Sequence, residues 1–290
     1  MGGEGSSLPG GGTRGKERFG YARDAMTKVA LVGVPWDEQS SFARGAALGP
    51  AAIRAAMRSP SSNLSTESGL DLDGHPGLVD AGDVEIPPGA AAPAAIETAV
   101  RQVLRSGARV LALGGDHAVT YPVLRAHADR HASLTVVHLD AHPDLYDAFE
   151  GNRLSHACPF ARILEEGLAK RLVQVGIRTQ NEPQRQQAAR FGVEQVDMRA
   201  WRPDLVVAAD GPVYVSVDLD VLDPAFAPGV SHPEPGGLST RDVIGVLQRL
   251  QGRVVGADVV ELNPARDTGD ATARVAAKLA RELLARLLSD

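Results

Sequence analysis

The sequence predicts an α/β fold with a mostly parallel sheet and helices on both of its faces. Short β-branched runs recur along the chain, and most of them are continuously apolar rather than alternating. Continuous apolar runs are expected of strands that are buried on both faces of a parallel sheet. Helical patterns lie between the runs, and strands that alternate with helices form βαβ units.

The expected strands are the runs rich in valine, isoleucine and leucine. They cover residues 29–34, 109–115, 134–140, 172–178, 213–220 and 254–261.

The expected helices are marked by their periodicity and by their first residues. Within 93–105 the apolar residues fall on one stripe of a helix. Pro50 suits the first position of another helix, and Ser239 with Asp242 three residues later is close to a capping box. Residues 271–288 are typical of a long C-terminal helix.

The ends of the chain and one internal segment differ from this pattern. Residues 1–26 are rich in glycine and serine, lack apolar periodicity and lack the apolar core of a signal peptide, so we predict a mostly disordered tail. We expect a single domain over 27–290. The polar stretch 58–76 is expected to be an irregular surface excursion.

Composition and charge narrow the classes of function. The chain has 290 residues, 43% of them hydrophobic, and a net charge of −6, without the basic clusters of a nucleic-acid-binding protein. A mildly acidic surface is compatible with a cationic substrate. No apolar run is long enough to span a membrane. Cys158 is the single cysteine, which suits packing and a reducing, cytoplasmic setting.

Acidic residues and histidines follow four of the expected strands. Ligands bind beyond the carboxyl ends of the strands of an open parallel sheet, so these residues are the candidates for a site. They are Asp116, His117, Asp140, His142, Asp144, Asp218, Asp220, Asp223 and Glu261.

The spacing of these residues predicts a metal site. Asp140, His142 and Asp144 occupy every second position, as do Asp218 and Asp220, and such residues share one face of an extended chain. Burying ionised carboxylates without compensation is costly, and no Lys or Arg lies within these motifs. Imidazole and carboxylate ligands suit Mn²⁺, Mg²⁺ or Zn²⁺, and a set of this size suits two ions that share bridging carboxylates. The alternative is a solvated strand end, which is the usual meaning of an isolated D-x-D.

The other histidines have simpler interpretations. His138 is expected to be either a buried, hydrogen-bonded histidine or a residue that supports a ligand. His232 lies in the loop GVSHPEPGGLS, where a substrate-facing role and a surface role both remain open. The histidines expected at the surface are His75, His127 and His131.

Taken together, the motifs resemble the ureohydrolase superfamily of arginase, agmatinase, guanidinobutyrase, proclavaminate amidinohydrolase and formiminoglutamase. The matching stretches are GGDH (114–117), DAHPD (140–144), SVDLDVLDP (216–224) and DVVELNP (258–264), with GVPWDEQSSFARGAALGPAAIR (33–54) near the N-terminus. The resemblance implies a three-layer α/β/α sandwich with an eight-stranded, mostly parallel sheet, in one catalytic domain. It also implies a homo-oligomer, commonly a trimer or hexamer.

The resemblance further implies a site for two Mn²⁺ ions per subunit, with Asp140 and Asp218 as bridges. The ligand sets would be His117, Asp140, Asp144 and Asp218 for one ion and Asp140, His142, Asp218 and Asp220 for the other.

The implied reaction is hydrolysis of a guanidinium group by a water that the two ions share. Asp144 would accept the proton or a hydrogen bond of this water. Glu261 resembles the acid that pairs with the substrate guanidinium. His156, in the stretch SHACPF, resembles the proton-shuttling histidine, although a surface or capping histidine is the alternative.

The identity of the substrate depends on loops. Residues 145–155 and 176–186 depart from the arginase pattern, which favours a small cationic guanidino compound without an α-carboxylate. Agmatine, giving putrescine and urea, is the first expectation and guanidinobutyrate the second, with arginase and formiminoglutamase activities as alternatives. A single-zinc amidohydrolase of the histone-deacetylase type and a non-catalytic relative are further alternatives, and the complete ligand set argues against both.

Overall fold

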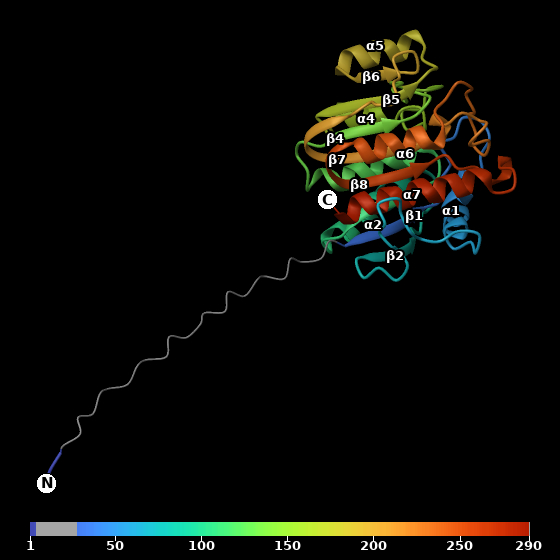
Figure 1. Cartoon of the computed structure of the whole chain (residues 1–290). Helices are drawn as coiled ribbons and strands as arrows, with labels where there is room; N and C mark the ends of the chain where they lie inside the picture. The colour runs from blue at the N-terminus through green and yellow to red at the C-terminus, as the bar shows by residue number, and fades with distance from the viewer. Residues whose placement is uncertain (4–27, 290) are drawn as a thin grey trace.

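A computed structural model describes residues 1–3 and 28–289 (Figure 1). The tail predicted over 1–26 therefore lies, apart from its first three residues, outside the described part of the chain. One sheet runs through the middle of the molecule, with β2 at one edge and β6 at the other. None of the helices in the described residues combines the length and the hydropathy needed to cross a membrane.

The sheet has eight strands in the order β2-β1-β3-β8-β7-β4-β5-β6, and all neighbouring strands are parallel. The strands are β1 (Val29–Val34), β2 (Leu78–Asp83), β3 (Arg109–Gly114), β4 (Thr135–Leu139), β5 (Arg171–Ile177), β6 (Glu194–Asp197), β7 (Ala208–Asp218) and β8 (Gln251–Val260). Each strand expected from an apolar run is present. The two edge strands, β2 and β6, were not expected, because edge strands are more exposed and their sequences LVDAGD and EQVD contain no apolar run.

Helices cover both faces of the sheet and make it the middle layer of a three-layer sandwich. The helices are α1 (Gly49–Met57), α2 (Ala92–Arg105), α3 (Thr120–Ala128), α4 (Pro159–Glu165), α5 (Glu182–Phe191), α6 (Thr240–Arg249) and α7 (Ala271–Ser289). In β1, Leu31 packs into a core with α1, α6 and α7, whereas Ala30 packs into a second core with α2, α3 and α4. The predicted α/β/α sandwich is confirmed.

The predicted helix starts are also present. Pro50 lies in the first turn of α1. Ser239 caps α6 and forms the complete capping box, in which the Ser239 hydroxyl accepts from the Asp242 N–H and the Asp242 carboxylate accepts from the Ser239 N–H. The stretch 58–76 contains no helix or strand, as expected.

The sheet topology brings the polar strand ends together. The four strands that the acidic and histidine motifs follow are β3, β8, β7 and β4, and these are consecutive neighbours in the sheet. Because all four are parallel, their carboxyl ends meet at one edge. Segments that are far apart in the sequence therefore deliver their side chains to one place.

Candidate metal centre and active site

Two of the site residues adopt an unusual backbone conformation. Asp144 has φ 50° and Glu261 has φ 66°, in the left-handed region that residues other than glycine seldom occupy. Strain of this kind clusters at functional sites, where the surrounding structure holds it in place. Here it turns two carboxylates into the same pocket.

The first ligand group is centred on His117. Its Nδ1 atom lies 3.1 Å from Asp140 Oδ2, 3.0 Å from Asp144 Oδ2 and 3.1 Å from Asp218 Oδ2. This nitrogen is buried and has no hydrogen bond of acceptable geometry to any described residue. Adjacent ligands of an octahedral ion with bonds of about 2.1 Å are roughly 3 Å apart. The spacing therefore fits a divalent ion between the four side chains.

The second ligand group adjoins the first through Asp140. His142 Nδ1 lies 2.9 Å from Asp220 Oδ2 and 3.4 Å from Asp140 Oδ1. Asp140 thus presents one oxygen to each group, which is the geometry of a bridging ligand. The second oxygen of Asp218 instead accepts the backbone N–H of Asp220 at 2.8 Å. A bridging role for Asp218 stays a prediction.

The negative charges of the carboxylates in this cluster are balanced only if the cluster holds positive charge. Burial raises the pKa of Asp218 well above its usual value, and the neighbouring Asp220 and Asp140 raise it further. Burial and then Asp140 raise the pKa of Asp220 to about 6. Burial opposes charging of His142, yet Asp220 and Asp140 outweigh it and raise its pKa to about 12. Among the described residues no Lys or Arg forms an ion pair with these carboxylates, so the balancing positive charge has to come from protons or metal ions.

One set of buried groups behind the ligands orients Asp140. His138 Nε2 lies 2.7 Å from Asp140 Oδ2, and the amide of Gln174 lies 3.0 Å from His138 Nδ1. Both His138 and Gln174 are fully buried. The expectation that His138 is buried and hydrogen-bonded is confirmed, and its support of a metal ligand stays a prediction.

A second buried network supports His117 and was missed by sequence reasoning. His117 Nε2 lies 3.0 Å from Ser216 Oγ, which donates to Asp258 Oδ1 at 2.6 Å. The hydroxyls of Tyr214 and Thr120 donate to the other Asp258 oxygen. Such outer partners fix the orientation of a metal-binding imidazole. The signal in the sequence is a serine and an aspartate inside the apolar runs of β7 and β8.

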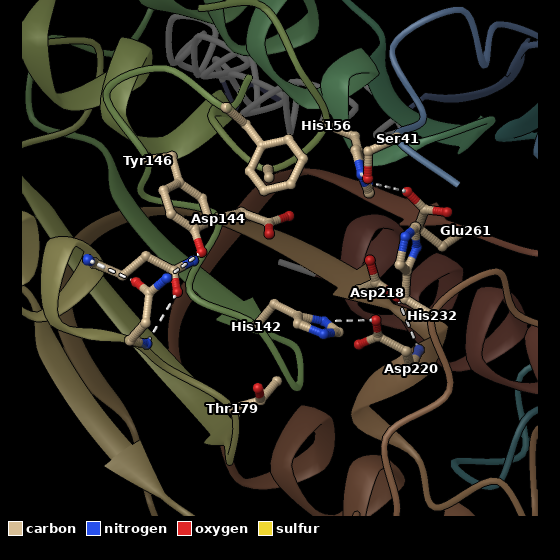
Figure 2. Close-up of a pocket in the computed structure, with 14 residues that line it drawn as sticks. Ser41, His142, Asp144, Tyr146, His156, Thr179, Asp218, Asp220, His232 and Glu261 are labelled. Carbon is tan, nitrogen blue, oxygen red and sulfur yellow. Dashed lines mark hydrogen bonds and ion pairs between the residues drawn. The ribbon is translucent and has the colours of Figure 1, made fainter. Parts of the chain in front are cut away.

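A pocket of about 190 Å³ opens beside the ligand groups (Figure 2). One part of its wall consists of charged and imidazole side chains, including His142, Asp144 and Glu261. The uncharged part of its wall includes Tyr146, Phe149, Thr179, Asn181 and Gln184.

His156 and Glu261 form a buried pair on the pocket wall. His156 Nδ1 lies 3.2 Å from Glu261 Oε1, and His156 Nε2 lies 2.8 Å from Ser41 Oγ. Burial disfavours the charged imidazole, but Glu261 outweighs it and raises the pKa of His156 to about 9. The imidazole can therefore hold a proton at neutral pH. The structure brings both residues to the site that the sequence predicted for them.

The remaining candidates are placed as follows. His232 lines the pocket, with its ring centroid 4.8 Å from that of His156. Cys158 is buried as a packing residue, and burial raises the pKa of its thiol to about 11. Asp116 is buried but accepts the backbone N–H groups of Gln39 and Ala118. Asp223 accepts backbone N–H groups of its own loop and does not line the pocket.

The expectation of a surface position for His127 is wrong. The side chain is fully buried, with its Nδ1 atom 2.9 Å from the Val123 carbonyl and its ring 5.2 Å from that of Tyr214. The last turn of α3 faces β7, and that packing could not be inferred from the sequence HADRH.

Comparison with known proteins identifies the family. The model of the "Arginase family" matches residues 27–285. The chain belongs to the arginase family. It is 49% identical over 280 residues to "Arginase 1, mitochondrial" of Arabidopsis thaliana, covering 91% of this chain and 82% of the relative. It is 38% identical over 285 residues to an agmatinase of Chromobacterium violaceum, covering 92% and 86%.

Solved structures of this family share the fold. The arginase from Medicago truncatula superposes with a TM-score of 0.85 at 45% identity, covering 90% of this chain and 88% of the other. Proclavaminate amidinohydrolase from Streptomyces clavuligerus superposes with a TM-score of 0.81 at 34% identity, covering 91% and 92%. This arginase-family chain is accordingly a hydrolase that acts on C–N bonds of guanidino compounds, and the family's binuclear metal chemistry matches its two ligand groups.

Proposed function

We propose that this chain hydrolyses the guanidinium group of L-arginine to urea and L-ornithine with two Mn²⁺ ions per subunit. The observation that carries the reaction is the junction of the two ligand groups through Asp140 beside the pair His156–Glu261. The identity of 49% and 46% to two arginases of Arabidopsis thaliana supports arginine as the first substrate. The uncharged part of the pocket wall suits the net-neutral α-amino acid head of arginine, because Thr179, Asn181 and Gln184 offer both donors and acceptors.

Agmatine is the second candidate. Tyr146 and Phe149 lie in the uncharged part of the pocket wall with their ring centroids 5.2 Å apart, and aromatic faces attract a single ammonium group. The departures of residues 145–155 and 176–186 from the arginase pattern favour the same substrate. Neither observation requires the substrate to carry an α-carboxylate.

The ligands of the two ions follow from the two groups. His117, Asp140, Asp144 and Asp218 would hold one ion, and Asp140, His142 and Asp220 the other, with Asp218 as a further bridge. Nitrogen and oxygen donors of this kind suit Mn²⁺. When bound, the two ions would supply a nucleophile by lowering the pKa of a water to about 7.

Glu261 is proposed to bind the guanidinium. Its Oε1 accepts the backbone N–H of His117 at 2.9 Å, and its Oε2 has no partner among the described residues. A carboxylate held in this way can accept the planar N–H groups of a guanidinium. The reacting carbon is thereby held beside the ligand groups, where Asp144 can accept a proton or hydrogen bond from the attacking water.

His156 is proposed to supply the proton that the leaving amine needs. At neutral pH it is protonated, because its pKa is raised to about 9, and it lines the same pocket as Glu261. Ser41 holds the ring through Nε2. The acid is thus oriented before the substrate arrives.

The test is an assay of product release with Mn²⁺ across L-arginine, agmatine, guanidinobutyrate and formiminoglutamate. We expect the highest kcat/KM for L-arginine. A higher value for agmatine would reverse the order of the two candidates. If no compound reacted although two ions were bound, the chain would be a non-catalytic member of the family.

The remaining expectations concern the setting of the enzyme. We propose a homo-oligomer, trimeric or hexameric, which light scattering of the purified protein tests, and neither a nucleic acid nor a membrane as a partner. A cytoplasmic location stays a prediction, since several similar plant arginases carry names that include "mitochondrial".

A further inference from the structure

A third cluster of metal-binding side chains lies on the pocket wall, apart from the two ligand groups. His156, His232 and Glu261 each offer one ligand atom, and these atoms lie within 4.8 Å of one another. His156 and Glu261 are 7% and 3% exposed, and His232 is half-buried. Figure 2 shows the three side chains together, although they come from separate segments of the chain.

The distance between two of the ligand atoms in this cluster matches tetrahedral zinc. His156 Nδ1 and Glu261 Oε1 are 3.2 Å apart, and two ligands of a tetrahedral zinc ion with bonds of about 2.0 Å are roughly 3.3 Å apart. The contact between Ser41 Oγ and His156 Nε2 orients the ring so that Nδ1 faces the cluster. Metal-binding histidines usually have such a partner on the second nitrogen.

The cluster also contains a buried atom without a partner. Glu261 Oε2 is buried, and no described residue forms a hydrogen bond with it. A buried carboxylate oxygen that lacks a partner is costly, so this position attracts a cation. The pocket gives solutes access to it, because all three residues line its wall.

We propose that His156, His232 and Glu261 form a third metal site, which binds Zn²⁺ reversibly and inhibits the enzyme. Two histidines, one glutamate and an open fourth position are a known ligand set for zinc. The inhibitory effect rests on the proposed function, because zinc would occupy the groups assigned to guanidinium binding and to proton delivery. Zinc and the guanidino substrate would therefore exclude each other. His232 adds the third ligand to the pair His156–Glu261.

The test counts metal ions. The Mn²⁺-loaded protein is equilibrated with increasing Zn²⁺, and the sum of manganese and zinc per chain is measured after free metal is removed. We expect three ions per wild-type chain and two per chain of His232→Asn. The sum is used because zinc can replace manganese at the other two positions without changing the total.

The matched control is His131→Asn, which removes a half-buried histidine that stacks on His127 and does not line the pocket. It should bind three ions like the wild type. A wild-type total that stays at two would overturn the proposal even if the His232 variant failed to fold. A total of three in His232→Asn would overturn it as well.

The activity measurement separates this inference from the proposed function. In the wild type, Zn²⁺ should raise the apparent KM for the substrate at least tenfold, and in His232→Asn it should change KM less than twofold relative to the zinc-free variant. Inhibition of equal strength in both proteins would contradict the assigned site. If three ions bound but no guanidino compound reacted at all, the proposed function would fail and the metal site would stand.

Discussion

His117 and His127 lie at opposite ends of one stretch of chain, the short 3-10 turn His117–Val119 followed by α3, and both are fully buried. Their protonation behaviour is opposite. Burial lowers the pKa of His127 to about 4, whereas Asp140, Asp144 and Asp218 overcome burial and raise the pKa of His117 well above its usual value. His127 faces a backbone carbonyl and the ring of Tyr214.

Burial alone keeps a histidine neutral, and a buried positive charge requires neighbouring negative charges. His117, at the end of the stretch that faces the pocket, has such neighbouring negative charges. Its excess negative charge distinguishes a metal site from an ordinary core.

The largest effect on activity is expected from the removal of a proposed metal ligand. His117→Ala and Asp220→Ala should lower the bound Mn²⁺ and the activity together, because each group loses a direct ligand. The loss in kcat/KM should exceed the roughly 10²–10⁴-fold contribution of a general acid. Metal analysis and steady-state kinetics measure both effects. A His117→Ala protein that kept two ions would contradict the assigned ligand set.

Removal of the proposed acid should separate chemistry from metal binding. His156→Ala should keep two Mn²⁺ ions and lose kcat by about 10²–10⁴-fold. The control is the metal content of the same preparation. Loss of manganese along with turnover would show that His156 has a different role.

The buried His127 should make the free energy of unfolding depend on pH. The pKa of this histidine is lowered to about 4, from 6.5 for the free residue, so the unfolded chain binds the proton first as the pH falls. Its contribution to stability is complete above pH 6.5 and is lost as the pH falls toward 4, by up to about 3 kcal/mol. Denaturant unfolding of metal-free protein at pH 7.5 and 4.5 should show a smaller acid loss for His127→Gln than for wild type. Equal losses would contradict the assignment.

The smallest effect should come from the support behind His117. Ser216→Ala removes the hydroxyl between His117 Nε2 and Asp258. Loss of such an outer partner should weaken metal binding by about 10–100-fold, measured by competition with a chelator. Ser216→Thr retains the hydroxyl and should retain most of the affinity. An unchanged affinity in Ser216→Ala would mean that packing alone orients the imidazole.

The features that depend on neighbours along the chain could be predicted from the sequence. The apolar runs that become the inner strands, the capping box at Ser239 and the alternation of Asp140, His142 and Asp144 are all local patterns, because strand and helix geometry fix which nearby side chains share a face. The motifs and their order were enough to propose six metal ligands, and the structure brings those six residues together.

Contacts between distant segments could not be predicted from these local patterns. The edge strands β2 and β6 pair without an apolar run, and His127 is buried by its contact with β7. The Ser216–Asp258 support and the cluster of His156, His232 and Glu261 depend on the order of the strands in the sheet and on the packing of loops. Those contacts join residues that are remote in sequence, and their geometry is set by how the whole chain packs.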